Sequence, residues 1–176
     1  MALKSTIYKI QLQVSDMNRH YYAAHSLSVA CHPSESLVRM LARVIVFGLH
    51  ADDKLSFGRG LSTVEDAPLW IKDDTGEVKL WLEVGNPSVD RMMGLKGRAD
   101  AYANYSYQES ANVWWQKHAD ELKNLAKCRY YLLPESVLKT LSHSVTRQMD
   151  IGIMLTDDSV MLTGDLNAEF TLQALL

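Results

Sequence analysis

The sequence is short of cysteine and of long apolar runs, and each shortage excludes a class of protein. Only Cys31 and Cys128 occur among 176 residues, and neither belongs to a CxxC or Cys/His cluster. A disulfide framework and a zinc site are therefore not expected, and a reducing compartment fits best. No apolar run long enough for a signal peptide or a membrane span follows Met1, so we expect a cytoplasmic protein without membrane contact.

Excess positive charge and familiar catalytic motifs are lacking too. The chain has 18 Lys and Arg against 21 Asp and Glu, which gives a net charge of -3. A protein that coats nucleic acid nonspecifically carries a broad basic surface, so any contact with nucleic acid must be local here. The sequence has no GxSxG, Walker A or dinucleotide-binding fingerprint, and its histidines show no HExxH spacing.

The composition that is present favours a folded core. A hydrophobic content of 47% over 176 residues is enough to bury a core without disulfides or structural metal, so we predict one domain, residues 1–176. Alternating apolar residues predict an N-terminal hairpin within residues 6–29 and C-terminal strands within residues 150–172. Since a stable sheet needs three or more strands, the two ends are predicted to share one β layer.

Between the two ends the periodicity changes. A buried helix is predicted first, starting at residues 33–35 and running to about residue 48, followed by strands at 55–60, 69–72 and 78–84. A second helix, capped by Ser88, is predicted to run to about residue 100. The remaining predicted elements are a strand at 102–107, a helix at 109–122, a strand at 128–132 and a helix at 134–142. Three successive strands favour a meander, and the helix after them favours a parallel crossover. The predicted fold class is mixed α/β (α+β), with a mixed central sheet plus the terminal β layer.

The strand at 78–84 carries the main candidate residue, Glu83. By the two-residue period, Glu83 lies opposite the apolar face of this strand, close to its end and before Gly85. Upstream, Glu65 and Asp66 precede the neighbouring strand. Carboxylates on adjacent strands beside a basic helix are typical of a site for a hard divalent cation and a phosphate. The alternative is a solvated or ion-paired glutamate on an edge strand.

The first predicted helix carries a charged stripe on an otherwise apolar surface. Glu35, Arg39 and Arg43 share one face because they are four residues apart. The stripe could line a metal and phosphate cleft, with Glu35 as an outer ligand, or it could be an ordinary ion-pair ladder.

Further basic residues lie near Glu83 in the predicted order of elements. Arg91 and Arg98 are seven residues apart on one predicted helix face, with Lys96 displaced from them. They could approach a phosphate or form a solvated basic face. Arg59, between two glycines near the end of the predicted strand at 55–60, could be a phosphate clamp or a strand-end salt bridge.

Several segments together make the chain resemble the bacterial YaeQ family. These segments are Ala2–Lys9, His32–Glu35, Phe57–Leu61, Leu80–Gly85 and Trp114–Trp115. The resemblance covers essentially the whole chain. It implies a compact variant of the PD-(D/E)XK nuclease superfamily, whose restriction-endonuclease-like core is helix, three strands, helix, strand.

The superfamily resemblance implies a role for each acidic candidate. Glu83 stands for the acidic residue of the (D/E)XK strand, and Asp66 or its neighbour Glu65 stands for the acidic residue before the second strand. Glu35 matches the acidic residue often found on the first helix. The resemblance implies that Asp66, Glu83 and Glu65 hold Mg²⁺, or Mn²⁺, which activates water for phosphodiester hydrolysis of DNA or RNA.

The lysine of the superfamily pattern is missing, because Gly85 stands in its place. The resemblance implies that Lys96 or Arg91 supplies the basic group from the neighbouring helix. Two hypotheses follow. The first is a Mg²⁺-dependent nuclease or related phosphodiesterase, and the second is a catalytically inactive nuclease-fold protein that binds nucleic acid or protein. The missing strand lysine and the acidic net charge favour the second.

Overall fold

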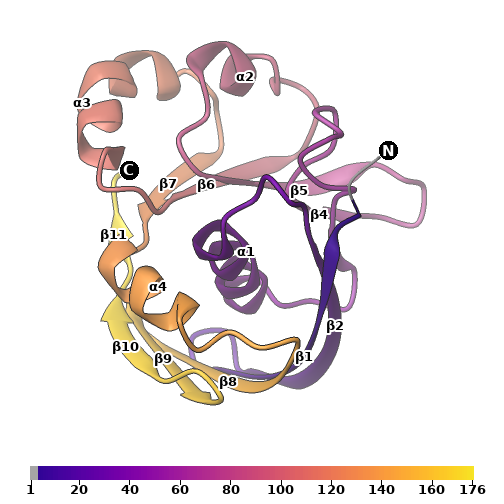
Figure 1. Ribbon diagram of the computed structural model, residues 1–176. Coiled ribbons are helices and arrows are strands. Elements are labelled where there is room, and N and C mark those ends of the chain that lie inside the picture. Colours follow the sequence, from indigo (N-terminus) through magenta and orange to yellow (C-terminus); the bar gives the residue numbers. More distant parts are fainter. Residues whose placement is uncertain (1–3) are drawn as a thin grey trace. The chain divides into compact units, whose positions relative to one another are not determined.

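The computed structural model describes residues 4–176 as two compact units, each with its own sheet (Figure 1). The first unit consists of Met1–Ala51 and Pro134–Leu172, and the second of Asp52–Leu133 and Gln173–Leu176. Both units therefore combine segments that are distant in sequence. Across residues 4–176 there are two mixed sheets and four helices, which confirms the predicted mixed α+β class.

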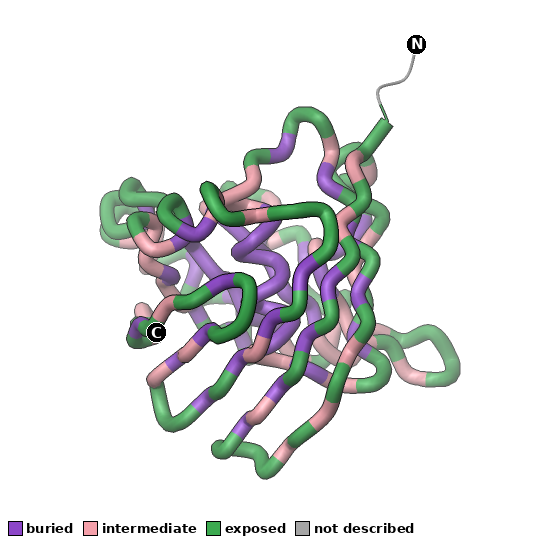
Figure 2. The backbone as a smooth tube through the Cα atoms, turned by 60° about the horizontal axis from the view of Figure 1, so that its bottom comes forward, coloured by how far each residue is buried: buried purple, intermediate pink, exposed green. Residues whose placement is uncertain are grey.

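The first unit carries a five-stranded sheet in the order β10-β9-β8-β1-β2. Its strands are β1 (Thr6–Asp16), β2 (Tyr21–Cys31), β8 (Gln148–Thr156), β9 (Ser159–Gly164) and β10 (Ala168–Thr171). β1 and β2 form the antiparallel hairpin, and β8 runs parallel to β1. Buried and exposed residues alternate along the long strands, so one face of the sheet is covered (Figure 2). The predicted β layer shared by the two chain ends is confirmed.

Two helices cover the inner face of this sheet. α1 (Leu37–Leu49) contacts β1, β2 and β8, and α4 (Glu135–Ser142) contacts α1 and β10. α1 is buried from Met40 to Gly48, as its apolar sequence predicts. Among residues 4–176, no helix combines the length and the hydropathy needed to cross a membrane.

The start of α1 differs from the prediction, which placed it at residues 33–35. Ser36 is the N-cap, since its hydroxyl accepts from the backbone N–H three residues later at 3.1 Å. The competing Ser34 is engaged elsewhere, because its hydroxyl lies 2.6 Å from His32 Nδ1. Glu35 consequently precedes the helix and does not lie in its first turn.

The second unit carries a six-stranded sheet in the order β11-β7-β6-β5-β4-β3. Its strands are β3 (Leu55–Phe57), β4 (Leu69–Lys72), β5 (Val78–Val84), β6 (Ala101–Ser106), β7 (Cys128–Leu132) and β11 (Gln173–Ala174). β3, β4 and β5 form an antiparallel meander, and β5, β6 and β7 are parallel, joined through α2 (Val89–Met93) and α3 (Ala111–Leu122). The predicted meander and crossover are confirmed. β3 is shorter than predicted: it ends at Phe57, and the chain turns beyond it, with Gly60 at φ of 107°.

The second helix is also much shorter than predicted. Ser88 caps it as expected, but α2 has only five residues. Gly94 is its C-cap, and the chain continues in turns that include Gly97, at φ of 78°. Lys96 and Arg98 therefore lie in turns beyond the helix, and the predicted common helix face for Arg91 and Arg98 is wrong.

Candidate functional site

Glu83 lies in the interior of the second unit. β5 lies between β4 and β6, so the predicted edge position of Glu83 is wrong, whereas the ion pair of that alternative is present, with Arg91. The residue is 3% exposed. Its Oε1 accepts from Trp81 Nε1 at 2.8 Å and from Arg91 Nε at 3.0 Å, and Arg91 Nη2 lies 2.8 Å from the same oxygen. A buried carboxylate needs such partners because water no longer solvates it.

Arg91 links Glu83 to the loop that precedes β4. Its Nη1 donates to the Val64 carbonyl at 2.8 Å, and its Nη2 donates to the Asp66 carbonyl at 3.4 Å. One guanidinium therefore connects a helix, a strand and a loop. Of the two predicted substitutes for the missing lysine, Arg91 is the one that contacts Glu83. Lys96 is exposed, and within residues 4–176 its side chain has no hydrogen bond or ion pair.

Asp66 is held by a different arginine. Its Oδ2 accepts from the Arg59 backbone N–H at 2.8 Å and from Arg59 Nε at 2.9 Å, and its Oδ1 accepts from Arg59 Nη2 at 2.9 Å. The Asp66 side chain is 6% exposed and that of Arg59 is 74% exposed. Arg59 thus forms the strand-end salt bridge, one of its two predicted roles. Its hydrogen bonds lower the pKa of Asp66 to about 2.

The Asp66–Arg59 pair should make stability depend on acid pH. Since the pKa of Asp66 is lowered in the folded chain, the pair contributes fully above the ordinary carboxyl pKa of 3.8 and is lost as the pH falls towards about 2. Arg59→Met is therefore expected to flatten the decline in unfolding free energy across this interval. Urea denaturation of both proteins at a series of acid pH values measures this, and identical slopes would contradict it.

A backbone constraint explains why glycine stands at the position of the missing lysine. Gly85 has φ of 112°, which residues with a side chain rarely adopt. Its carbonyl accepts from the buried Asn104 Nδ2 at 3.1 Å and the buried Ser106 Oγ at 3.0 Å. A β-carbon added at Gly85 would lie 3.8 Å from Tyr107, an ordinary contact distance. The positive φ therefore favours glycine at position 85, whereas the space around it would admit a β-carbon.

Restoring the lysine should cost stability. Gly85→Lys is expected to lower the free energy of unfolding by about 1–2 kcal/mol, because an L residue must adopt a positive φ. Gly85→Asn should lose less, since asparagine tolerates positive φ better than lysine does. Chemical denaturation of the two variants beside the wild type makes the comparison. A lysine variant as stable as the wild type would show that the backbone does not exclude lysine.

Glu35 belongs to the first unit and is bound by two arginines of α1. Its carboxylate accepts from Arg43 Nε at 2.9 Å, from Arg43 Nη2 at 2.5 Å and from Arg39 Nη1. Arg43 also donates to the Ala30 carbonyl at 2.8 Å. Glu35, Arg39 and Arg43 therefore form the ion-pair ladder, one of the two predictions for this stripe.

The acidic residues do not form an open metal site. Mg²⁺ binds carboxylate oxygens together with water, but the charges of Asp66 and Glu83 are already balanced by arginine. Glu65 is exposed, and its backbone carbonyl accepts from Arg98 Nη2 at 3.2 Å. In the part of the chain from residue 4 to 176, no three His, Cys, Asp or Glu side chains gather into a metal-binding group. The arrangement does not fit Mg²⁺, and the metal roles of these residues stay predictions.

Two partners of this site were not predicted from the sequence. Asn104 is directly opposite Glu83 in the β5–β6 register and is fully buried. Its Oδ1 has no hydrogen-bond partner within residues 4–176. Trp81 supplies a donor to Glu83, and the two-residue spacing on one strand was the signal for that contact.

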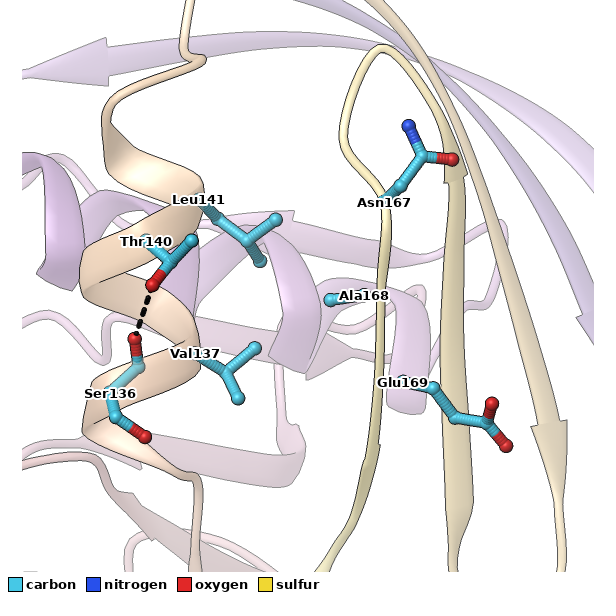
Figure 3. A pocket seen from close by; sticks show the side chains of 7 residues that line it. All are labelled: Ser136, Val137, Thr140, Leu141, Asn167, Ala168 and Glu169. Carbon is cyan, nitrogen blue, oxygen red and sulfur yellow. Dashed lines mark hydrogen bonds between the residues drawn. The ribbon is translucent and has the colours of Figure 1, made fainter.

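A separate hollow of about 310 Å³ lies in the first unit, between α4 and β10 (Figure 3). Its lining residues are Ser136, Val137, Thr140, Leu141, Asn167, Ala168 and Glu169. A hydrogen bond joins Thr140 Oγ1 to the Ser136 carbonyl at 3.0 Å within α4. The predicted site residues do not line this hollow.

Comparisons with known proteins indicate one family. A model of the YaeQ protein family matches residues 1–172. The uncharacterised YaeQ proteins of Escherichia coli (strain K12) and Salmonella typhi are each 32% identical to this chain, over 95% and 93% of it and over 93% and 91% of their own lengths. The crystal structure of YaeQ from Xanthomonas axonopodis pv. citri has a TM-score of 0.93 at 34% identity and covers 97% of this chain and 98% of its own. That of YaeQ from Pseudomonas syringae has a TM-score of 0.93 at 32% identity and covers 98% and 96%.

Proposed function

The chain belongs to the YaeQ family, and we propose that it is a non-hydrolytic protein of the PD-(D/E)XK nuclease-like fold that binds nucleic acid through a local group of arginines. The observation that carries the proposal is the pairing of both candidate catalytic carboxylates with arginine: Glu83 with Arg91, and Asp66 with Arg59. Carboxylates neutralised in this way are poor ligands for a divalent cation.

The order of elements supports the nuclease-like fold. Along the chain, α1 is followed by β3, β4 and β5, then by α2 and β6, which is the helix, three strands, helix, strand order of the superfamily core. β3, β4, β5 and β6 are also neighbours in one sheet, as such a core requires. Asp66 precedes β4 and Glu83 lies on β5, the places of the superfamily acids.

The three arginines around the loop at residues 64–66 support binding of a phosphate backbone. Arg91 donates to carbonyls of this loop, Arg98 donates to another, and Arg59 holds the Asp66 carboxylate. Arg59 and Arg98 are exposed. Guanidinium groups bind phosphate oxygens through paired hydrogen bonds, so the exposed faces of these two can contact a nucleic-acid backbone. Such a contact is local, in keeping with the net charge of -3.

A binding experiment tests this proposal. We expect fluorescein-labelled single-stranded DNA and RNA to bind in the presence of EDTA, with Arg98→Ala weakening the affinity and lowering the salt slope by about 1. Arg129→Ala, at an exposed arginine of β7, is the matched control and should bind like the wild type. The proposal would be contradicted if the wild type did not bind DNA or RNA at low salt, or if Arg98→Ala and Arg129→Ala lost the same affinity.

The second candidate function is a Mg²⁺-dependent nuclease, and the positions of Asp66 before β4 and Glu83 on β5 favour it. The superfamily resemblance implies that Arg91 of the neighbouring helix replaces the strand lysine, and Arg91 Nη2 lies 2.8 Å from Glu83 Oε1. The assay is incubation of labelled DNA and RNA with the protein and Mg²⁺ or Mn²⁺. The non-hydrolytic proposal expects no product, whereas cleavage that Glu83→Gln abolishes would establish the nuclease.

A further inference from the structure

The five-stranded sheet of the first unit ends on one side in a long strand, β2. β2 has 11 residues and, within residues 4–176, pairs with β1 alone. The strand at the opposite end of the sheet, β10, has only four residues. A short edge strand is a common protection against pairing with another chain, and a long edge strand needs another device or a partner.

β2 carries none of the usual protective residues. Between Tyr21 and Cys31 there is no lysine, arginine, aspartate, glutamate or proline. The side chains on the open face of the sheet alternate with buried ones and are exposed; they are Tyr22, Ala24, Ser26, Ser28 and Ala30. Apart from Tyr22 these side chains are small, and β2 itself contributes no charge; a neighbouring cation is Lys9 of β1, whose Nζ donates to Ser28 Oγ at 2.5 Å. The edge can therefore accept a further strand.

We propose that β2 pairs antiparallel with β2 of a second copy of this chain, around a two-fold axis at Ser26. In this register Ser26 lies opposite Ser26 of the partner subunit, and Tyr22 lies opposite Ala30 of the partner subunit. This register is centred on Ser26, the middle residue of Tyr21–Cys31. At each end the Ala30 carbonyl keeps its bond from Arg43 Nη2, at 2.8 Å, so the new pairing is strongest in the middle of the strand. The two five-stranded sheets then become one continuous sheet.

Shape and polarity along the edge identify a second copy as the partner. Tyr22 is 56% exposed and Ile7 is 45% exposed, and Ile7 is directly opposite Ala30 in the β1–β2 register. Within one chain the Tyr22 hydroxyl donates to Met17 Sδ at 3.2 Å. In the proposed register the Tyr22 ring gives up this bond and lies over Ala30 of the partner subunit and Ile7 of the partner subunit. Because the axis repeats this contact, both ends of the interface bury an exposed apolar pair.

The middle of the interface fits as well. Ala24 lies opposite Ser28 of the partner subunit, so small side chains meet small side chains. No charged residue of β2 meets its own copy, which removes the like-charge repulsion that normally prevents a strand from pairing with itself. The interface is isologous, as expected for a two-fold dimer.

Molecular mass in solution tests the proposal. Sedimentation equilibrium of the wild type is expected to give twice the chain mass of 19.9 kDa at high micromolar concentration. Ser26→Lys places two like charges opposite each other and should weaken dimerisation by at least about tenfold. Thr163→Lys adds the same charge to an exposed position of β9 and should leave the dimer intact. Thermal denaturation checks that both variants fold.

Two further variants locate the axis and the apolar contact. Ser26→Cys is expected to form an intersubunit disulfide on mild oxidation, because opposite residues of an antiparallel pair have Cα atoms about 4.5–5.5 Å apart. Tyr22→Ser should weaken the dimer without unfolding the chain. A wild type that is monomeric over the whole concentration range, or a Ser26→Lys variant that dimerises like Thr163→Lys, would overturn the proposal.

Discussion

Replacing Arg91 by methionine is expected to lower the free energy of unfolding by about 3 kcal/mol, within the range for breaking one side of a buried ion pair. The Glu83 side chain is 5% exposed and would keep the Trp81 indole as its donor, but it would lose the arginine charge. The Arg91 donors to the Val64 and Asp66 carbonyls are lost at the same time. Urea denaturation at neutral pH measures the change.

The Arg91 prediction has a matched set of controls. Glu83→Gln removes the charge but retains an acceptor for the Trp81 indole, and the double variant Glu83→Gln with Arg91→Met leaves no unpaired buried charge. The double variant is therefore expected to lose less stability than the sum of the two single variants. Additive losses, or an Arg91→Met variant as stable as the wild type, would show that the pair does not stabilise the fold.

Replacing Gly58 by alanine is expected to cost about 2–3 kcal/mol, in the upper range for overpacking. A β-carbon at Gly58 would overlap the Ala67 backbone oxygen and lie 3.0 Å from the Asp66 β-carbon. Gly58 N also donates to the Pro68 carbonyl at 3.1 Å, so this close approach closes the loop that carries Asp66. Chemical denaturation is the measurement.

Gly60→Ala is the control for Gly58→Ala. Gly60 has φ of 107° but no atom within 4 Å of an added β-carbon. Its replacement should cost only the conformational penalty of about 1–2 kcal/mol. Gly58 does not have a positive φ, so its expected cost rests on the close approach alone. A Gly58→Ala variant that lost no more stability than Gly60→Ala would contradict the prediction.

The order and type of the elements could be read from the sequence, because period-two and helical patterns depend on neighbouring residues. The strands 69–72, 78–84 and 128–132 have the predicted bounds for this reason. The ends of helices are harder to predict, because neighbouring residues compete for the capping position and a single glycine can turn the chain. Ser36 caps α1 because Ser34 is bound to His32, and Gly97 turns the chain where a longer helix was predicted.

The sequence predicted which residues belong to the candidate site, but not which arginine pairs with which carboxylate. The two-residue period placed Glu83 away from the apolar face of β5, and the order of elements brought Arg91 near it. Which arginine binds which carboxylate depends on loop geometry, which no periodicity describes. Asn104 was missed because only the register of two parallel strands places it opposite Glu83.

The interleaving of the two units sets the order in which the chain can fold during synthesis. β1 leaves the ribosome early, but its parallel partner β8 begins at Gln148, after β3 to β7 of the second unit. The second unit in turn receives β11, Gln173–Ala174, only at the end of the described chain. Pairings between such distant segments close slowly because of the entropy of the intervening chain. The β1–β2 hairpin therefore lacks its neighbouring strand β8 until most of the protein has been synthesised.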